Sequence, residues 1–278
     1  MGSADLIENN IFQHISGPVL QDIASGQVVA YNFSIDNYYS PLTWMTPGQS
    51  QHGAGTAMNL MEGNSGQGIR GDNVHGSHNF LTIFRNYYTG VEPGKTNETT
   101  PVLLNTHTRF YNVVGNVLGT SGYHTNYQAI VPSGILADTS IYSLGWSGSG
   151  GTTGSLPNDP LVATTLLRWG NFDYATNTSR FVSTEIPLGN AVPSSQTLPA
   201  SFYLAARPIW WGTMPWPPIG PDVTGGQDRS GHAHKIPAQV CYEASLKNPD
   251  GTLIFNANNC YGNTPSSLPS SPANLTLQ

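Results

Sequence analysis

Six Asn residues recur along this chain at comparable intervals, and each follows a short, largely apolar run. They are Asn10, Asn37, Asn64, Asn86, Asn116 and Asn171. The intervals between them are 27, 27, 22, 30 and 55 residues, and the last is about two of the others. Self-similarity at a period of about 20 to 50 residues is typical of stacked-repeat proteins. The spacing therefore predicts a chain that winds through successive layers of similar structure.

Composition supports short strands and excludes two classes of function. Hydrophobic residues make up 38% of the 278 residues and charged residues 9%, against roughly 25% charged in an ordinary soluble domain. Gly (31) and Pro (21) are abundant, which favours β-structure with many turns. The net charge of -6 and the lack of a basic stripe argue against nucleic-acid binding. The sequence contains no apolar run of about 18 residues, so it predicts no membrane span.

Three segments follow from the pattern. Residues 4–182 carry the repeats, residues 183–262 are rich in Pro and aromatic residues without a period, and residues 263–278 read as a flexible tail. Loops at 38–55 and 87–101 interrupt the repeats, and such insertions often emerge on the binding face. The first repeat begins almost at once. We therefore expect its open side to be covered by a missing upstream segment or by a partner, including a second copy.

Cys241 and Cys260 lie 19 residues apart, outside the repeats, and are the two cysteines of the chain. In a chain with few Lys and many Thr and Asn, such a pair predicts one disulfide in an exported protein. Two buried thiols are the alternative. Two cysteines by themselves do not form a structural zinc site, which uses four ligands.

The Asn-terminated runs resemble the right-handed parallel β-helix of the pectin-lyase-like superfamily, over roughly residues 5–182. The resemblance implies an all-β solenoid in which Asn side chains stack at the turns, because one amide both donates and accepts along a column. Residues 198–221 resemble a segment that often follows β-helices in uncharacterised bacterial exported proteins. It would pack on the solenoid, with Trp210, Trp211 and Trp216 covering an apolar strip or forming a platform for sugar rings.

The superfamily contains polysaccharide lyases, glycoside hydrolases, tailspikes and adhesins, and fold alone does not choose among them. We expect a protein that is secreted or at the cell surface and acts on a polysaccharide, as a lyase or a hydrolase, in a groove on the β-helix. A non-catalytic glycan-binding or structural module is the alternative. The catalytic motifs of the family do not match this sequence. Calcium is a candidate cofactor by analogy with the lyases, with Asp36, Glu62 and Asp72 as carboxylates that could bind it, but the sequence contains no calcium-binding signature.

The densest polar cluster lies at residues 68–86, just after Glu62. A lyase needs a base for the proton next to the sugar carboxylate and a cation to hold that carboxylate, whereas a hydrolase needs two carboxylates. Aligning the repeats on their Asn residues also places Asp36 and Arg85 on one line. The predicted catalytic residues are Asp72, His75, His78 and Arg85. The predicted substrate-binding residues are Glu62, Arg70, His107, Arg109, Trp210 and Trp211.

Overall fold

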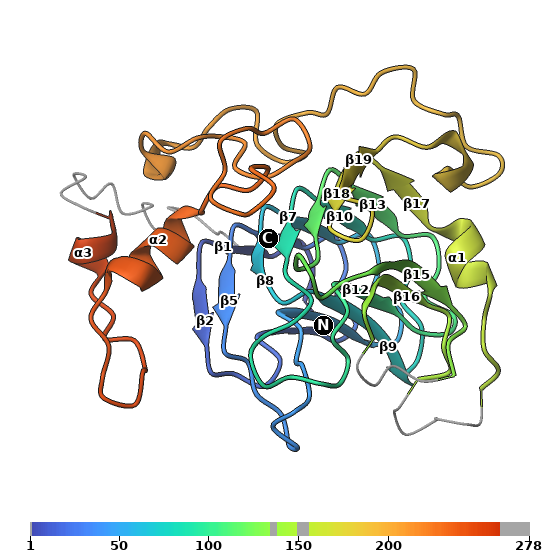
Figure 1. Cartoon of the computed structure of the whole chain (residues 1–278), viewed down its shortest axis with the longest axis horizontal. Coiled ribbons are helices and arrows are strands. Elements are labelled where there is room, and N and C mark those ends of the chain that lie inside the picture. Colours follow the sequence, from blue (N-terminus) through green and yellow to red (C-terminus); the bar gives the residue numbers. More distant parts are fainter. Residues whose placement is uncertain (1, 134–137, 149–155, 262–278) are drawn as a thin grey trace, which may run out of the picture.

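The computed structural model describes residues 2–133, 138–148 and 156–261, and within them the chain passes repeatedly through three sheets of parallel strands (Figure 1). One circuit of the chain contributes a strand to the first sheet, then to the second, then to the third. The predicted tail at 263–278 lies outside the described residues. The observed architecture is predominantly β with stacked parallel strands, as the Asn spacing predicts.

The strands are short, and each sheet pairs strands from successive circuits. The first sheet contains β1 (Leu6–Glu8), β4 (Val28–Ala30), β7 (Leu60–Glu62), β10 (Thr82–Phe84), β13 (Asn112–Val114) and β17 (Leu167–Trp169). The second contains β2 (Ile11–Gln13), β5 (Phe33–Ile35), β8 (Ser65–Gly66), β11 (Tyr87–Tyr88), β14 (Val117–Leu118), β18 (Asn171–Asp173) and the antiparallel β19 (Thr178–Arg180). The third contains β3 (Val19–Gln21), β6 (Gln49–Gly53), β9 (Ile69–His75), β12 (Val102–Leu104), β16 (Ser140–Leu144) and β15 (Asn126–Ile130).

The core lies inside the circuits, where each strand points one or more side chains inward. In the first sheet the central residues Val29, Met61, Ile83 and Val113 are in register and fully buried. Alternation along a strand sends their neighbours outward. Each circuit therefore contributes a few apolar side chains, and stacking joins them into one continuous core. No single circuit could bury its own apolar face, which is why the fold depends on repetition.

A column of six Asn residues runs along the corner between the first and second sheets. Its members are Asn10, Asn32, Asn64, Asn86, Asn116 and Asn171. In each step, Nδ2 and the backbone N–H of one Asn donate to Oδ1 of the next, at 2.8 to 3.0 Å. Five of the six were predicted. Asn37 was wrong, because Asn32 holds that place.

Asn37 is buried elsewhere, and its amide donates to Ser34, to the backbone of Thr46 and to Gln67. The predicted line through Asp36 and Arg85 is therefore also wrong. The residue that precedes the ladder Asn in that circuit is Tyr31. Tyr31 and Arg85 share a left-handed backbone conformation (φ 54° and 52°), which turns the chain through the corner.

The interval of 55 residues before Asn171 contains one circuit and not two, which corrects the expectation from spacing. Within it the chain adds β15, which pairs in parallel with β16 at the edge of the third sheet. The helix α1 (Leu161–Thr165) then leads back to the first sheet. An extra strand in one sheet lengthens a circuit without adding a ladder position.

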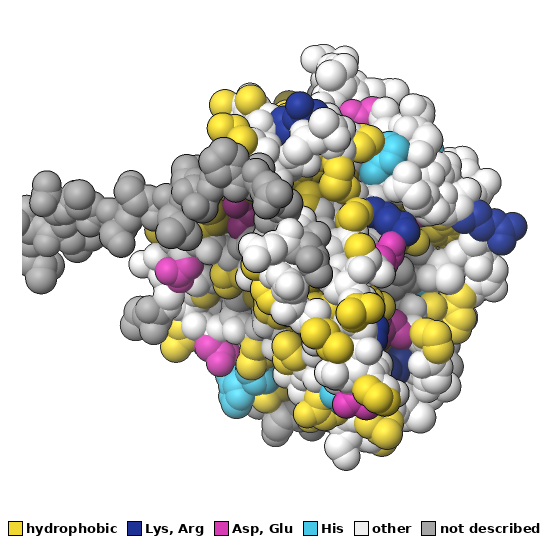
Figure 2. Space-filling view, turned by 90° about the vertical axis from the view of Figure 1, so that its left-hand side faces the viewer, with side chains coloured by type: hydrophobic (Ala, Val, Ile, Leu, Met, Phe, Trp, Pro, Cys, Tyr) yellow, Lys and Arg dark blue, Asp and Glu magenta, His cyan; other side chains and the backbone are white. Residues whose placement is uncertain are grey.

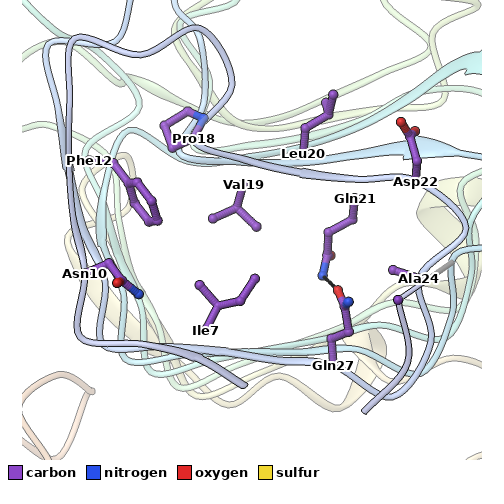
Figure 3. A pocket seen from close by; sticks show the side chains of 11 residues that line it. Ile7, Asn10, Phe12, Pro18, Val19, Leu20, Gln21, Asp22, Ala24 and Gln27 are labelled. Atoms are coloured by element: carbon purple, nitrogen blue, oxygen red, sulfur yellow. Dashed lines mark hydrogen bonds between the residues drawn. The ribbon is translucent and has the colours of Figure 1, made fainter. Parts of the chain in front are cut away.

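The two ends of the circuits differ. At the late end, Arg168 lies over the rings of Tyr127 and Tyr142, and Arg180 lies over Tyr127. At the early end, Ile7, Phe12 and Val19 face a cavity of about 390 Å³ (Figure 3). Gln21 and Gln27 form a hydrogen bond across this cavity. On that side, no further circuit of the described chain covers the apolar side chains at the centre of the first circuit.

Residues 183–261 lie on the outside of the circuits (Figure 1). They contain the 3₁₀ turns η1 (Ser183–Glu185) and η2 (Ile209–Trp211) and the helices α2 (Pro237–Ala244) and α3 (Ala257–Tyr261). The predicted disulfide between Cys241 and Cys260 is formed and joins α2 to α3. We refer to residues 183–236 as the strap.

Candidate functional site

A polar cleft of about 350 Å³ lies on the outer face of the third sheet. Arg70 and Asp72 stand two residues apart on β9, so both side chains point outward, while Ile69 and Gly71 point into the core. His52 reaches the cleft from the neighbouring strand β6. The lining residues are Tyr39, Trp44, Met45, Thr46, His52, Arg70, Asp72, Val74, Glu98 and Asn105.

His52 and Asp72 form a hydrogen-bonded pair in this cleft. Nδ1 of His52 lies 2.7 Å from Oδ2 of Asp72, and the other carboxylate oxygen accepts the backbone N–H of Val74 at 3.0 Å. The side chain of Asp72 is 5% exposed and that of His52 is 22% exposed. A buried carboxylate bonded to Nδ1 fixes the orientation of the imidazole and directs Nε2 away from itself. The ring of His75 meets that of His52 edge-on, at 4.5 Å between centroids.

Arg70 is held between two carboxylates. Its Nη1 donates to Oε2 of Glu98 at 2.6 Å, and its Nε lies 3.9 Å from Oδ2 of Asp72. Burial opposes the charge of Arg70, but Glu98 and Asp72 outweigh it and raise the pKa of the guanidinium. The cleft thus contains one permanent cation, two carboxylates and the imidazole of His52 within a small volume, and the exposed His75 lies beside His52.

An aromatic pair forms one wall of the cleft. Tyr39 and Trp44 come from the loop between β5 and β6, and their rings lie 6.0 Å apart at 36°. The backbone of Trp44 pairs with that of Asn97, next to Glu98. Tyr39 is 48% exposed, so part of its ring is open to solvent. Aromatic faces of this kind bind the C–H faces of sugar rings.

His78 lies in the core below the cleft and does not reach it. Its Nε2 lies 2.6 Å from the backbone oxygen of Asp72, and its Nδ1 lies 2.9 Å from the hydroxyl of Tyr111. Burial lowers the pKa of His78 to about 4. The imidazole is therefore neutral near pH 7, and it supports the strand segment that carries Asp72.

Glu62 and Arg85 lie under the strap and away from the cleft, because they stand at the end of β7 and just after β10 in the first sheet, whereas β9 belongs to the third sheet. Arg85 is fully buried and forms a two-pronged ion pair with Asp222 of the strap, at 2.7 and 2.8 Å. Glu62 accepts the hydroxyl of Tyr31 at 3.0 Å and the backbone N–H of Phe202 at 2.8 Å. Burial raises the pKa of Glu62. Both residues anchor the strap.

His107 and Arg109 bind Asp159 after the strand β12 instead of extending the cleft. Nε of Arg109 donates to Oδ2 of Asp159 at 2.7 Å, and the backbone N–H of His107 donates to the same oxygen at 3.0 Å. Burial opposes the charge of Asp159, but the hydrogen bonds from Arg109 and His107 outweigh it and lower its pKa. This cluster fastens the turn that precedes α1.

Trp210 and Trp211 pack against Tyr31 at the corner of the first and second sheets. Their ring centroids lie 6.1 and 4.8 Å from that of Tyr31. Trp211 is buried, and its indole N–H donates to the backbone of Pro215 at 3.0 Å. The two tryptophans therefore cover an apolar strip of the corner, the first of the two roles that the sequence allowed.

The carboxylates considered for calcium lie in three different environments. Asp36 pairs with His14 at 3.0 Å on the surface, Glu62 lies under the strap, and Asp72 lies in the cleft. In the described residues, no group of three or more His, Cys, Asp or Glu is arranged to hold a metal ion.

None of the helices described is both long and apolar enough to cross a membrane. The face in Figure 2 shows hydrophobic and uncharged side chains with few cations.

The structure brings together three of the predicted residues, Arg70, Asp72 and His75, and adds His52, Glu98, Tyr39 and Trp44. The added residues come from loops or from a neighbouring strand. Register supplies the missing signal, since Gln51 pairs with Gly71 and the next residues are His52 and Asp72. Chemically, the cleft offers an oriented imidazole for proton transfer beside a cation and an aromatic wall.

Comparisons with protein-family models, with curated proteins and with solved structures find no match to this chain. The arrangement of residues in the cleft is therefore the basis for a functional assignment.

Proposed function

We propose that this protein binds a polysaccharide in the cleft on the third sheet and cleaves it, with the circuits forming a right-handed parallel β-helix similar to the pectin-lyase-like superfamily. The three stacked parallel sheets and the Asn column support the fold assignment. The pair formed by His52 and Asp72, at 2.7 Å beside Arg70, carries the functional assignment. A secreted or surface location follows from this proposal and from the disulfide.

The pair favours elimination over hydrolysis. Hydrolysis needs two carboxyl groups that face the glycosidic bond. Here the carboxylates of Asp72 and Glu98 turn toward His52 and Arg70. The group left for proton transfer is an imidazole, which suits removal of the proton next to a sugar carboxylate.

In the proposed reaction, Nε2 of His52 takes the proton from the carbon adjacent to the substrate carboxylate. The electron pair forms a carbon–carbon double bond and the glycosidic C–O bond breaks. The departing oxygen takes a proton from His75 or water. Asp72 holds the imidazole in place and stabilises its protonated form, which makes it a positioning residue. Arg70 stabilises the negative charge that develops on the carboxylate.

Tyr39 and Trp44 would hold a neighbouring sugar by stacking. This aromatic wall also supports the second candidate, a glycan-binding module without turnover, because a wall of this kind needs no catalytic group. The two candidates share one cleft and differ in whether His52 transfers a proton.

The test is a panel of acidic and neutral polysaccharides, followed by the absorbance of unsaturated products and by new reducing ends. Elimination predicts both signals, and His52→Gln should abolish both. His14→Gln is the matched control, because His14 forms the same kind of pair with Asp36 outside the cleft. Reducing ends without the absorbance would show hydrolysis. Binding that Trp44→Ala weakens, without turnover, would show a binding module, and no binding at all would refute the proposal.

A further inference from the structure

A further cavity, of about 1020 Å³, lies between the first sheet and the strap, whereas the cleft lies on the third sheet. None of the residues that line it is charged. Its floor is the outward column Leu60, Thr82, Asn112 and Leu167, which are in register on four strands. We call this cavity the apolar groove. Its other lining residues are Met58, Asn59, Phe80, Phe110, Val114, Thr164, Thr165, Pro187, Leu188, Asn190 and Phe202.

One wall of the groove consists of three large apolar residues at the same turn of successive circuits. Met58, Phe80 and Phe110 all have positive φ (58°, 60° and 60°), and all are about half exposed or more. The rings of Phe80 and Phe110 stack at 5.1 Å and 8°. The equivalent residue one circuit earlier is Gly26, at φ 67°. The turn therefore does not need a side chain here.

Large residues at this position carry two costs. A side chain in the left-handed region is strained, and an exposed apolar side chain gains little from burial. Glycine would avoid both costs, as Gly26 does. Three such residues in a row, beside the fully exposed Leu188, indicate an apolar surface with a binding role.

Several polar groups of the groove are already bonded within the protein. Nδ2 of Asn112 donates to Oγ1 of Thr82 at 3.3 Å, and Oγ1 of Thr165 donates to the backbone of Leu161 at 2.7 Å. The backbone N–H of Met58 donates to Phe80, and that of Phe110 donates to Thr165. A sugar or an extended peptide needs partners for its hydroxyl or amide groups. The groove offers such ligands few donors.

We propose that the apolar groove binds the unbranched aliphatic chain of a single lipid-like molecule. An aliphatic chain has no charge and no hydrogen-bonding group, which suits a lining that is uncharged and mostly apolar. Four strands of floor give the site a length along the stack of circuits, which suits a linear ligand. The groove is separate from the cleft of the proposed reaction, so a test of one proposal does not decide the other.

The experiment is calorimetric titration with hexyl, octyl and decyl β-glucoside, each below its micelle-forming concentration, with glucose and maltohexaose as chain-free controls. Binding through the chain predicts that affinity rises about tenfold for each two added methylenes. Equal affinity across the series, binding of maltohexaose, or binding to phospholipid vesicles but not to the monomeric glucosides would overturn the proposal.

Two variants locate the site. Phe80→Gly removes one ring at a position where the backbone prefers glycine, so the fold should remain intact while affinity for decyl glucoside falls at least tenfold. Leu188→Glu places a charge at the groove and should have the same effect. Ile209→Glu is the control, because Ile209 is equally exposed on the strap but does not line the groove. Unchanged affinity in Phe80→Gly and Leu188→Glu would refute the assignment.

Discussion

Nδ1 of His52 lies 2.7 Å from a carboxylate oxygen of Asp72, and the carboxylate is nearly buried. The chain contains a second pair of this type, His14 and Asp36, at 3.0 Å, but its side chains are 55% and 62% exposed. Water competes with the second pair and screens it. The structure therefore contains an oriented imidazole in a cleft and a solvated counterpart with similar geometry, which serves as an internal control.

The first prediction concerns His52. If Nε2 of His52 is the base, His52→Gln should lower kcat by about 10² to 10⁴, because general-base catalysis contributes that much. Asp72→Asn should lower kcat through loss of orientation and leave KM nearly unchanged. Steady-state kinetics on the polysaccharide found in the panel, with circular dichroism as a check on folding, measures both effects. Equal loss in His14→Gln would show that the effect is not specific to the cleft.

The second prediction concerns pH. His78 has a pKa of about 4 in the folded protein, against 6.5 for an unperturbed histidine, because it is buried. The unfolded state therefore binds the additional proton between these values, and stability falls as pH decreases from about 6.5 to about 4. The protonation of His78 lowers the free energy of unfolding by roughly 3 kcal/mol over this range, and this decrease levels off below pH 4.

Urea unfolding at several pH values measures this dependence. His78→Gln retains hydrogen bonding but does not titrate, so its stability should fall less over the same range. Part of the slope should persist, because burial also lowers the pKa of His124. An identical pH dependence in wild type and His78→Gln would contradict the burial of a neutral His78.

The third prediction concerns the Asn column. The side chain of Asn86 accepts the backbone and side-chain N–H groups of Asn64 and donates to Asn116 and to the backbone of Met61. Asn86→Ala should destabilise the protein by about 3 kcal/mol, because several buried partners lose their bonds together. Asn112→Ala is the control, since Asn112 makes one side-chain bond at a half-buried site. Similar losses for both, measured by chemical unfolding, would show that the column has no special role.

The same column shows how far the sequence determines the fold. Each ladder Asn has the local pattern of an apolar run that ends at an amide, and Asn32 and Asn37 both fit it. A column through Asn37 has two equal intervals of 27 residues, whereas the intervals through Asn32 are 22 and 32. The loop between β5 and β6 lengthens that circuit, and a period cannot show where an insertion lies. Register between strands, which the sequence does not give, decides the position.

The site was harder to predict than the fold for a geometric reason. Residues 62–85 are close in sequence, but each circuit turns through three sheets, so the cluster is distributed over different faces. Arg70 and Asp72 remain together because they stand two apart on one strand. Glu62 and Arg85 lie under the strap, and His78 lies in the core. His52 and Glu98 reach the cleft from neighbouring circuits, about 20 to 30 residues away in the sequence. At such separations, spacing along the chain does not predict which residues are in contact.

The fourth prediction concerns the strap. The side chain of Arg85 is 1% exposed and pairs with the carboxylate of Asp222. The guanidinium of Arg85 also donates to the backbone oxygens of Pro199 and Ile219. Burial opposes the charge of Asp222, but Arg85 outweighs it and lowers the pKa of Asp222. Asp222→Ala leaves a buried guanidinium without its counter-charge, which costs several kcal/mol in buried pairs. Because Asp222 is half exposed, we expect roughly 3 kcal/mol.

Asp36→Ala is the matched control, because it breaks the exposed pair with His14 and should cost about 1 kcal/mol or less. Replacing Arg85 and Asp222 together by Met and Ala should restore much of the loss, since the guanidinium is then no longer buried without its counter-charge. Chemical unfolding of the three variants measures these differences, and limited proteolysis of residues 183–236 reports whether the strap is released. A strap that stays protected in Asp222→Ala, at wild-type stability, would mean that apolar packing of residues such as Trp211 holds it and that the ion pair does not.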